Sequence, residues 1–210
     1  MLLSKETLKD KTLISFWKIE ETLDELLDKL CRKDNLLVQI SQFGSEKRRL
    51  EYVATRVLLK ETLGEEKLIE HYPSGAPYIT DNSFNISIAH TGEYVAIILN
   101  PTKKVGIDIE KIGDRAVRVK NRFLSQNELD FIVNSTEKTH LTLMWCAKET
   151  LYKIIDIEVI DFVTDLNIMP FFPYISGTIE AKENCTRLKK NYTLTYRVEP
   201  EICCSWTVEN

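Results

Sequence analysis

The sequence has few of the residues that mark fibrous or disordered chains. Its 210 residues include only 7 Gly and 6 Pro, which excludes collagen and low-complexity disorder. Hydrophobic residues make up 43% of the chain and charged residues 29%, a balance typical of globular proteins. Folding at this length buries roughly 70% of the surface of the chain, which is enough for one good core or two small fused lobes.

Cysteines are few, odd in number and without CxxC spacing, which argues against a disulfide framework. They are Cys31, Cys146, Cys185, Cys203 and Cys204. The histidines are not spaced as ligand pairs, so a zinc site is not expected either. These are His71, His90 and His140. We therefore expect reduced, mostly buried thiols in a cytoplasmic protein.

Long apolar runs and an excess of positive charge are also missing. No stretch approaches the roughly 18 apolar residues of a membrane span, and the start, MLLSKETLKDK, turns polar too early for a secretory signal. The formal net charge of −4 argues against non-specific binding of nucleic acid or anionic membrane. We therefore expect no membrane or nucleic-acid partner, and a local basic site for any anionic ligand.

Residue patterns predict strands and helices in alternating blocks. The expected strands are 12–19, 84–90, 94–99, 104–110, 192–199 and 202–208, and the expected helices are 20–30, 45–63, 115–123, 125–133 and 140–155. Gly64 predicts the end of one helix, and Ser125 with Glu128 forms a capping box that predicts the start of another. This order indicates an α+β protein, with two lobes that each pack an antiparallel sheet on helices.

The segment Gly106-Ile107-Asp108-Ile109-Glu110 ends an apolar strand. Residues two apart share a face of a strand, so Asp108 and Glu110 point the same way. Two adjacent carboxylates repel each other unless a cation lies between them, and oxygen ligands suit Mg²⁺. The alternative is the exposed polar face of an edge strand.

The segment from Trp145 to Lys153 places Trp145, Glu149 and Lys153 on one stripe of a helix. Glu149 with Lys153 has the spacing of an ordinary helix ion pair. The same stripe could instead supply a carboxylate for a metal ion or a base, and an ammonium for a phosphate.

The strand that begins at Phe84 ends with His90, Thr91 and Gly92. A histidine at the end of a strand, beside a Thr-Gly turn, is well placed for a ligand. A structural role for this single histidine is the alternative.

Taken in order, these segments resemble the 4′-phosphopantetheinyl transferase superfamily, particularly its Sfp-type members. The family motifs F-N-[IL]-S, G-[IV]-D-[IV]-E, R-F-[FL]-[ST]-x-x-E and W-x-x-K-E-x-x-x-K correspond to Phe84–Thr91, Gly106–Glu110, Arg122–Glu128 and Trp145–Lys153. The segment RRLEYVATRVLLK also resembles the arginine-bearing helix of the family. The resemblance implies a pseudo-twofold pair of lobes, residues 1–103 and 104–210, in a monomer with its active site between them.

The resemblance implies transfer of 4′-phosphopantetheine from coenzyme A to a serine of an apo acyl or peptidyl carrier protein. The product left behind is adenosine 3′,5′-bisphosphate, and the enzyme would be of the holo-acyl-carrier-protein synthase kind. Breaking a pyrophosphate requires a cation on the phosphate oxygens and a base near the incoming hydroxyl. The expected cofactor is therefore Mg²⁺.

Residue roles follow from the same resemblance. Asp108, Glu110 and Glu149 would hold Mg²⁺, Glu149 would also be the base, and Lys153 would neutralise the pyrophosphate, so the catalytic set is Asp108, Glu149 and Lys153. His90 would touch the 3′-phosphate of the nucleotide, with several cations nearby. Those cations are Lys47, Arg48, Arg49, Arg56 and Lys148, the last a weaker candidate because it points about 100° away from Glu149.

Two departures from the family pattern concern coenzyme A. Ala76 stands in Gly75-Ala76-Pro77-Tyr78 where the family often has a lysine, and Ala89 stands where it has a serine before the histidine. Each loss weakens binding by on the order of 1–3 kcal/mol if the lost contact was charge-assisted. We expect an active enzyme with lower affinity for coenzyme A. The alternatives are a non-catalytic paralogue that binds coenzyme A or a carrier protein, and a metal-dependent nuclease.

Overall fold

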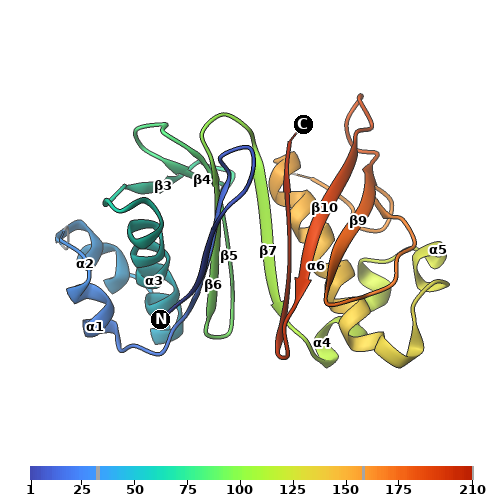
Figure 1. Cartoon of the computed structure of the whole chain (residues 1–210), viewed down its shortest axis with the longest axis horizontal. Coiled ribbons are helices and arrows are strands. Elements are labelled where there is room, and N and C mark those ends of the chain that lie inside the picture. The colour runs from blue at the N-terminus through green and yellow to red at the C-terminus, as the bar shows by residue number, and fades with distance from the viewer. Residues whose placement is uncertain (32–33, 158, 210) are drawn as a thin grey trace. The chain divides into compact units, whose positions relative to one another are not determined.

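The computed structural model describes residues 1–31, 34–157 and 159–209. The chain divides into two compact units, Met1–Thr102 and Lys103–Asn210 (Figure 1). Each unit packs helices on an antiparallel sheet, so the α+β class predicted from the sequence is confirmed.

The sheet of the N-terminal unit has the strand order β1-β2-β6-β5, and every pair in it is antiparallel. Its strands are β1 (Leu2–Thr7), β2 (Leu13–Lys18), β5 (Asn85–Thr91) and β6 (Tyr94–Asn100). A separate ribbon pairs β3 (Ile69–His71) with β4 (Pro77–Ile79). The central strand β6 is buried along its whole length, as its run of apolar residues predicts.

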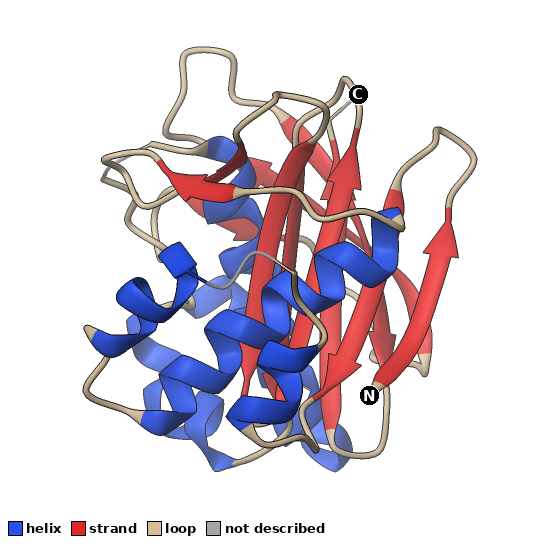
Figure 2. Ribbon diagram, turned by 90° about the vertical axis from the view of Figure 1, so that its left-hand side faces the viewer, coloured by secondary structure: helices blue, strands red, loops and turns tan. Residues whose placement is uncertain are grey.

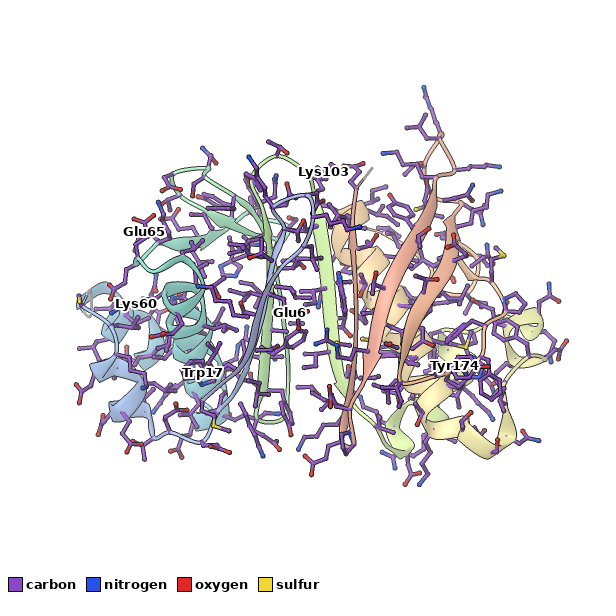
Figure 3. The ribbon with its side chains drawn as sticks, viewed as in Figure 1. Glu6, Trp17, Lys60, Glu65, Lys103 and Tyr174 are labelled. Carbon is purple, nitrogen blue, oxygen red and sulfur yellow. The ribbon has the colours of Figure 1, made fainter. Side chains whose placement is uncertain are left out.

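The helices of this unit are α1 (Leu23–Asp28), α2 (Asp34–Ser41) and α3 (Glu46–Leu63). Figure 2 shows them in front of the strands. One apolar face of α3, including Val53 and Val57, packs with Trp17 of β2, which is labelled in Figure 3. The helix ends at Gly64 with φ at +77°, where glycine is favoured because it lacks a Cβ.

The sheet of the C-terminal unit has the strand order β7-β11-β10-β9-β8, again fully antiparallel. Its strands are β7 (Val105–Lys111), β8 (Leu166–Ile168), β9 (Ser176–Glu183), β10 (Asn191–Val198) and β11 (Ile202–Val208). β7 is an edge strand of this sheet, and Asp108 lies opposite Ser205 of β11.

The helices of the C-terminal unit are α4 (Asp114–Val119), α5 (Gln126–Leu129) and α6 (Glu137–Ile155). α6 packs closely on β7 at Gly106. A Cβ added to Gly106 would lie only 2.6 Å from the backbone oxygen of Thr150. Only a glycine permits this approach. The capping box of Ser125 and Glu128 is formed and begins α5, as predicted.

Several elements differ from the sequence prediction. The helices expected over 115–123 and 125–133 are shorter, and the first passes into a 3₁₀ turn, Lys120–Arg122. The strands β1 and β9, the three-residue strands β3, β4 and β8, and the helix α2 were not predicted. All five cysteines are free, as expected. Among the described residues, no helix combines the length and apolar character needed to cross a membrane.

Candidate functional site

The face of β7 that carries Asp108 and Glu110 is turned toward α6. Gly106 lies on the same face and allows the helix to approach closely, whereas Ile107 and Ile109 point to the opposite side and are buried. Although β7 is an edge strand, Asp108 is only 7% exposed. The alternative of an exposed polar face is therefore excluded for Asp108.

Asp108 is held by a lysine from the helix. Lys153 Nζ lies 2.7 Å from Asp108 Oδ1 and also donates to the carbonyl oxygen of Ile107 at 3.0 Å. The second carboxylate oxygen, Asp108 Oδ2, is buried and has no hydrogen-bond partner among the described residues. A buried oxygen without a partner carries a desolvation cost, which a bound cation or donor would offset.

Glu110 is held by an aromatic residue of the same helix. The indole Nε1 of Trp145 donates to Glu110 Oε1 at 3.0 Å. The Trp145 ring packs edge-on against Phe123, with the ring centroids 5.0 Å apart. This packing fixes the indole, and the indole in turn orients the carboxylate.

Glu149 lies within the electrostatic range of both β7 carboxylates. Burial raises the pKa of Glu149 to about 7, and the negative charges of Asp108 and Glu110 act in the same direction. The positive charges of Lys153 and Arg115 oppose them. We call Asp108, Glu110, Glu149 and Lys153 the acidic site.

The acidic site has the chemistry of a magnesium site without the arrangement of a preformed one. In the described part of the chain, no three side chains of His, Cys, Asp or Glu are grouped closely enough to hold a metal ion as they stand. The buried Oδ2 of Asp108 has no hydrogen-bond partner among the described residues, and the pKa of Glu149 is raised by burial and then by the charges of Asp108 and Glu110. Both features are expected where oxygen ligands lack a cation. The residues therefore fit a hard cation such as Mg²⁺ in kind.

Lys148 lies in the interior of the C-terminal unit. Its ammonium donates to Glu128 Oε2 at 2.8 Å, and to the carbonyl oxygens of Phe123 and Phe162 at 2.7 Å each. Burial lowers the pKa of Lys148, and the charge of Glu128 opposes that effect. All three N–H groups of the ammonium are used, so none remains for a phosphate. These contacts do not favour the predicted role of Lys148 as a ligand of coenzyme A.

A second group of charged residues lies in the N-terminal unit, where α3 faces the end of β5. Glu51 is buried there, and around it lie Lys47 Nζ at 3.7 Å, Arg48 Nη1 at 3.8 Å and His90 Nδ1 at 3.5 Å. Arg48 Nη1 also contacts His90 Nε2 at 2.8 Å. We call Lys47, Arg48, Glu51 and His90 the basic cluster.

The remaining predicted cations of α3 are Arg49 and Arg56. Arg49 Nε donates to the carbonyl oxygen of Phe43 at 2.9 Å. The guanidinium of Arg56 lies 3.3 Å from the centroid of the Tyr52 ring, and burial lowers its pKa to about 10, so it remains charged at neutral pH. Arg56 Nη2 is buried without a hydrogen-bond partner among the described residues. The side chain therefore has a donor to spare.

Three features of these regions were missed by the sequence analysis. They are the central position of Glu51, the hydrogen bond from Trp145 to Glu110, and the close approach at Gly106. A carboxylate four residues after Lys47 resembles any exposed helix ion pair, so no local signal marked Glu51 as buried. The glycine that opens the G-x-D-x-E strand was a usable signal, because glycine inside a strand often marks close approach of another backbone.

Comparisons with known proteins point to one family. Residues 104–201 match the family model described as the 4′-phosphopantetheinyl transferase superfamily, a range that contains the whole acidic site. The chain is also similar to the L-aminoadipate-semialdehyde dehydrogenase-phosphopantetheinyl transferase of Xenopus laevis, with 25% identity over 129 residues. That similarity covers 50% of this chain and 43% of the length of the relative. The family match over residues 104–201 and the ordered motifs therefore agree on similarity to the 4′-phosphopantetheinyl transferase superfamily.

Proposed function

We propose that this protein transfers the 4′-phosphopantetheine group from coenzyme A to a serine of an apo acyl or peptidyl carrier protein. The observation that carries the proposal is the pairing of Lys153 with Asp108 where α6 lies on β7, within the residues that match the family model. The charges of both residues also act on the pKa of Glu149. A holo-acyl-carrier-protein synthase is the corresponding type of enzyme.

In the proposed reaction the serine oxygen attacks the phosphorus that bears the pantetheine arm. A new P–O bond forms to serine, and the bond from that phosphorus to the bridging pyrophosphate oxygen breaks. Adenosine 3′,5′-bisphosphate leaves with the bridging oxygen. Phosphoryl transfer of this kind depends on positioning and on neutralising charge more than on covalent chemistry by the protein.

Glu149 is the group best suited to accept the serine proton. A base works most efficiently when its pKa is near the working pH, and the pKa of Glu149 is raised to about 7 in the ligand-free protein. Lys153 is the cation nearest to Asp108, and its ammonium would neutralise the negative charge that develops on the pyrophosphate oxygens.

The proposed cofactor is Mg²⁺, held by Asp108, Glu110 and Glu149. When bound, it would supply positive charge to the phosphate oxygens. Support comes from the oxygen donors themselves and from the partnerless Oδ2 of Asp108. The indole of Trp145 keeps Glu110 oriented for this role.

The basic cluster is the proposed binding region for the nucleotide part of coenzyme A. Arg48 and His90, which are in contact at 2.8 Å, offer an arginine and an imidazole to a phosphate, and Lys47, Arg49 and Arg56 add positive charge around them. Cations of this kind form charge-assisted hydrogen bonds with phosphate oxygens. That the active site lies between two lobes of a cytoplasmic monomer stays a prediction from the sequence.

The test is to incubate the full chain with coenzyme A, Mg²⁺ and several apo carrier proteins and to measure the intact mass of each carrier. The proposal predicts a gain of one phosphopantetheine group on the serine. Coenzyme A binding without any gain would instead indicate a non-catalytic paralogue. Mg²⁺-dependent cleavage of DNA or RNA without a gain would indicate a nuclease.

A matched pair of variants makes the same assay specific to the acidic site. Glu149→Gln removes the proposed base, whereas Glu137→Gln makes the same change in the first turn of the same helix, where Glu137 pairs with Lys120. We expect transfer to be lost in the first variant and retained in the second. Equal activity in both variants would contradict the role of Glu149.

A further inference from the structure

Glu51 is the member of the basic cluster whose negative charge would repel an anionic ligand. Its side chain is 6% exposed, whereas those of Lys47 and Arg48 are 64% and 51% exposed. A buried carboxylate among ligand-binding cations carries a desolvation cost. Its position therefore calls for a reason beyond an ordinary helix ion pair.

The contacts of His90 define which ring nitrogen carries its proton. Arg48 Nη1 lies 2.8 Å from Nε2, and a guanidinium can only donate hydrogen bonds, so Nε2 must accept and cannot be protonated. The proton of the neutral ring is then on Nδ1. Nδ1 faces Glu51 Oε2 at 3.5 Å, which is the side where a negative charge favours a proton.

A phosphate ligand would change this arrangement in a definite way. Phosphate dianions offer only acceptors, so a phosphate that takes Arg48 away from His90 leaves the bare Nε2 lone pair facing another acceptor. That contact becomes favourable only when Nε2 gains a proton from solvent and donates it to the phosphate. The resulting imidazolium has positive charge on both nitrogens, and Glu51 lies next to the buried one.

We propose that Glu51 is a positioning residue for His90: it holds the Nδ1 proton, so that phosphate binding at Nε2 and Arg48 is accompanied by uptake of one proton. The inference rests on the proposed function, because the phosphate is taken to be that of the nucleotide of coenzyme A. Glu51 itself does not touch the ligand. It acts through the ring of His90 and through the charge of Arg48.

The other charged or titratable groups around His90 are compatible with this role. α3 contributes Lys47 and Arg48, whose positive charges disfavour an imidazolium until a phosphate neutralises them. From β3, His71 lies in the field of Arg48 and Arg56, and its pKa is lowered chiefly by burial and further by these two charges. On β4, the Tyr78 hydroxyl donates to Glu70 at 2.6 Å, and β6 places Val95 opposite His90. Of the groups named here, Glu51 is the one whose negative charge lies at Nδ1, at 3.5 Å.

The test compares Glu51→Gln with Glu46→Gln, which makes the same change of charge one turn earlier on α3, at an exposed residue. Binding of adenosine 3′,5′-bisphosphate is followed by titration calorimetry at pH 7.5 in buffers of different ionisation enthalpy, which reports the number of protons taken up. We expect close to one proton for the wild type and for Glu46→Gln, because the ordinary pKa of histidine is about 6.5. Glu51→Gln should take up less than about half a proton and bind roughly tenfold more weakly.

Nitrogen NMR of the His90 ring in the ligand-free protein provides an independent readout. The wild type and Glu46→Gln should show the Nδ1-protonated tautomer, and Glu51→Gln should show a mixture of tautomers. Wild-type proton uptake together with a wild-type tautomer in Glu51→Gln would overturn the proposal. If Glu51→Gln does not fold, Glu51→Asp, which keeps the charge, must retain proton uptake, and its loss there would also overturn the proposal.

The two proposals can fail separately. A wild-type protein that does not bind adenosine 3′,5′-bisphosphate overturns the proposed function, and with it the coupling of proton uptake to this ligand. The tautomer comparison is made without ligand, so it still decides whether Glu51 positions His90. A mixed tautomer already present in the wild type would overturn that positioning role even if nucleotide binding and phosphopantetheine transfer are both observed.

Discussion

The acidic site and the basic cluster are built in different ways. In the acidic site, contacts are short: Lys153 lies 2.7 Å from Asp108, and Trp145 lies 3.0 Å from Glu110. In the basic cluster, Arg48 contacts His90 at 2.8 Å, but the distances to Glu51 are 3.5–3.8 Å, and the side chains of Lys47 and Arg48 are 64% and 51% exposed. We infer from this difference that the acidic site performs the chemistry and that the basic cluster binds the ligand.

The largest effect is expected where the acidic site is changed directly. Glu149→Gln should reduce kcat by about 10³-fold, because general-base catalysis typically contributes 10²–10⁴-fold. The fold should survive, since the substitution removes a buried carboxylate whose charged form is disfavoured. Steady-state kinetics of carrier modification, with thermal unfolding as the check on folding, measure both quantities. A kcat within a few-fold of wild type would remove Glu149 from the mechanism.

The next effect probes how far the acidic site depends on close packing. In Gly106→Ala the new methyl would lie 2.6 Å from the backbone oxygen of Thr150, so α6 must move away from β7. We expect a loss of about 1–3 kcal/mol in the free energy of unfolding and about 100-fold in activity. Gly44→Ala is the matched control, because a Cβ there meets nothing within 4 Å. Similar behaviour of the two variants would show that close packing is not what positions the site.

A smaller and different effect is expected in the basic cluster. Arg48→Ala should raise KM for coenzyme A by about tenfold and leave kcat nearly unchanged, which is the pattern of lost substrate binding. Lys60→Ala, at the other end of α3 where the lysine is bound to Glu66 at 3.0 Å, should change neither parameter. A loss of kcat in Arg48→Ala would contradict a role of the basic cluster in binding alone.

The smallest effect at neutral pH concerns a histidine that contrasts with His90. His140 is fully buried, and burial lowers its pKa to about 4. The unfolded chain, with a pKa of about 6.5, binds more protons than the folded one between these values. Stability is therefore complete above pH 6.5 and falls as the pH drops toward 4, by about 1–2 kcal/mol between pH 7 and pH 5.

Denaturant unfolding at pH 7 and pH 5 measures this loss, and His140→Gln should flatten it. Gln retains an acceptor for the backbone N–H of Val133, which His140 Nδ1 accepts at 3.2 Å. An equally steep pH dependence in the variant would assign the loss to other groups.

The sequence predicted the acidic site better than the basic cluster, for a physical reason. A strand period of two and a helix period of about 3.6 determine which side chains share a face, so the sequence alone pairs Asp108 with Glu110 and Glu149 with Lys153. The same periods say nothing about what lies opposite. Neither the ion pair of Asp108 with Lys153 nor the partners of Lys148 in the interior could be predicted.

The basic cluster shows that periodicity in the sequence does not predict which side chains are buried. Counting cations on α3 identified Lys47 and Arg48, but burial of Glu51 depends on how α3 packs on the sheet, which is a tertiary property. The strands β3, β4 and β8 were missed because three-residue strands leave no periodic signal. The capping box at Ser125 was predicted because its geometry is entirely local.

The separate roles of the acidic site in chemistry and of the basic cluster in nucleotide binding are tested most directly by one dissociation constant. It is that of adenosine 3′,5′-bisphosphate, measured for the wild type, Glu149→Gln and Arg48→Ala. This measurement reports binding without turnover. We predict that Glu149→Gln binds as the wild type does although it fails to modify the carrier protein, and that Arg48→Ala binds about tenfold more weakly. Wild-type affinity in Arg48→Ala, with lost affinity in Glu149→Gln, would contradict the separate roles of the two sites.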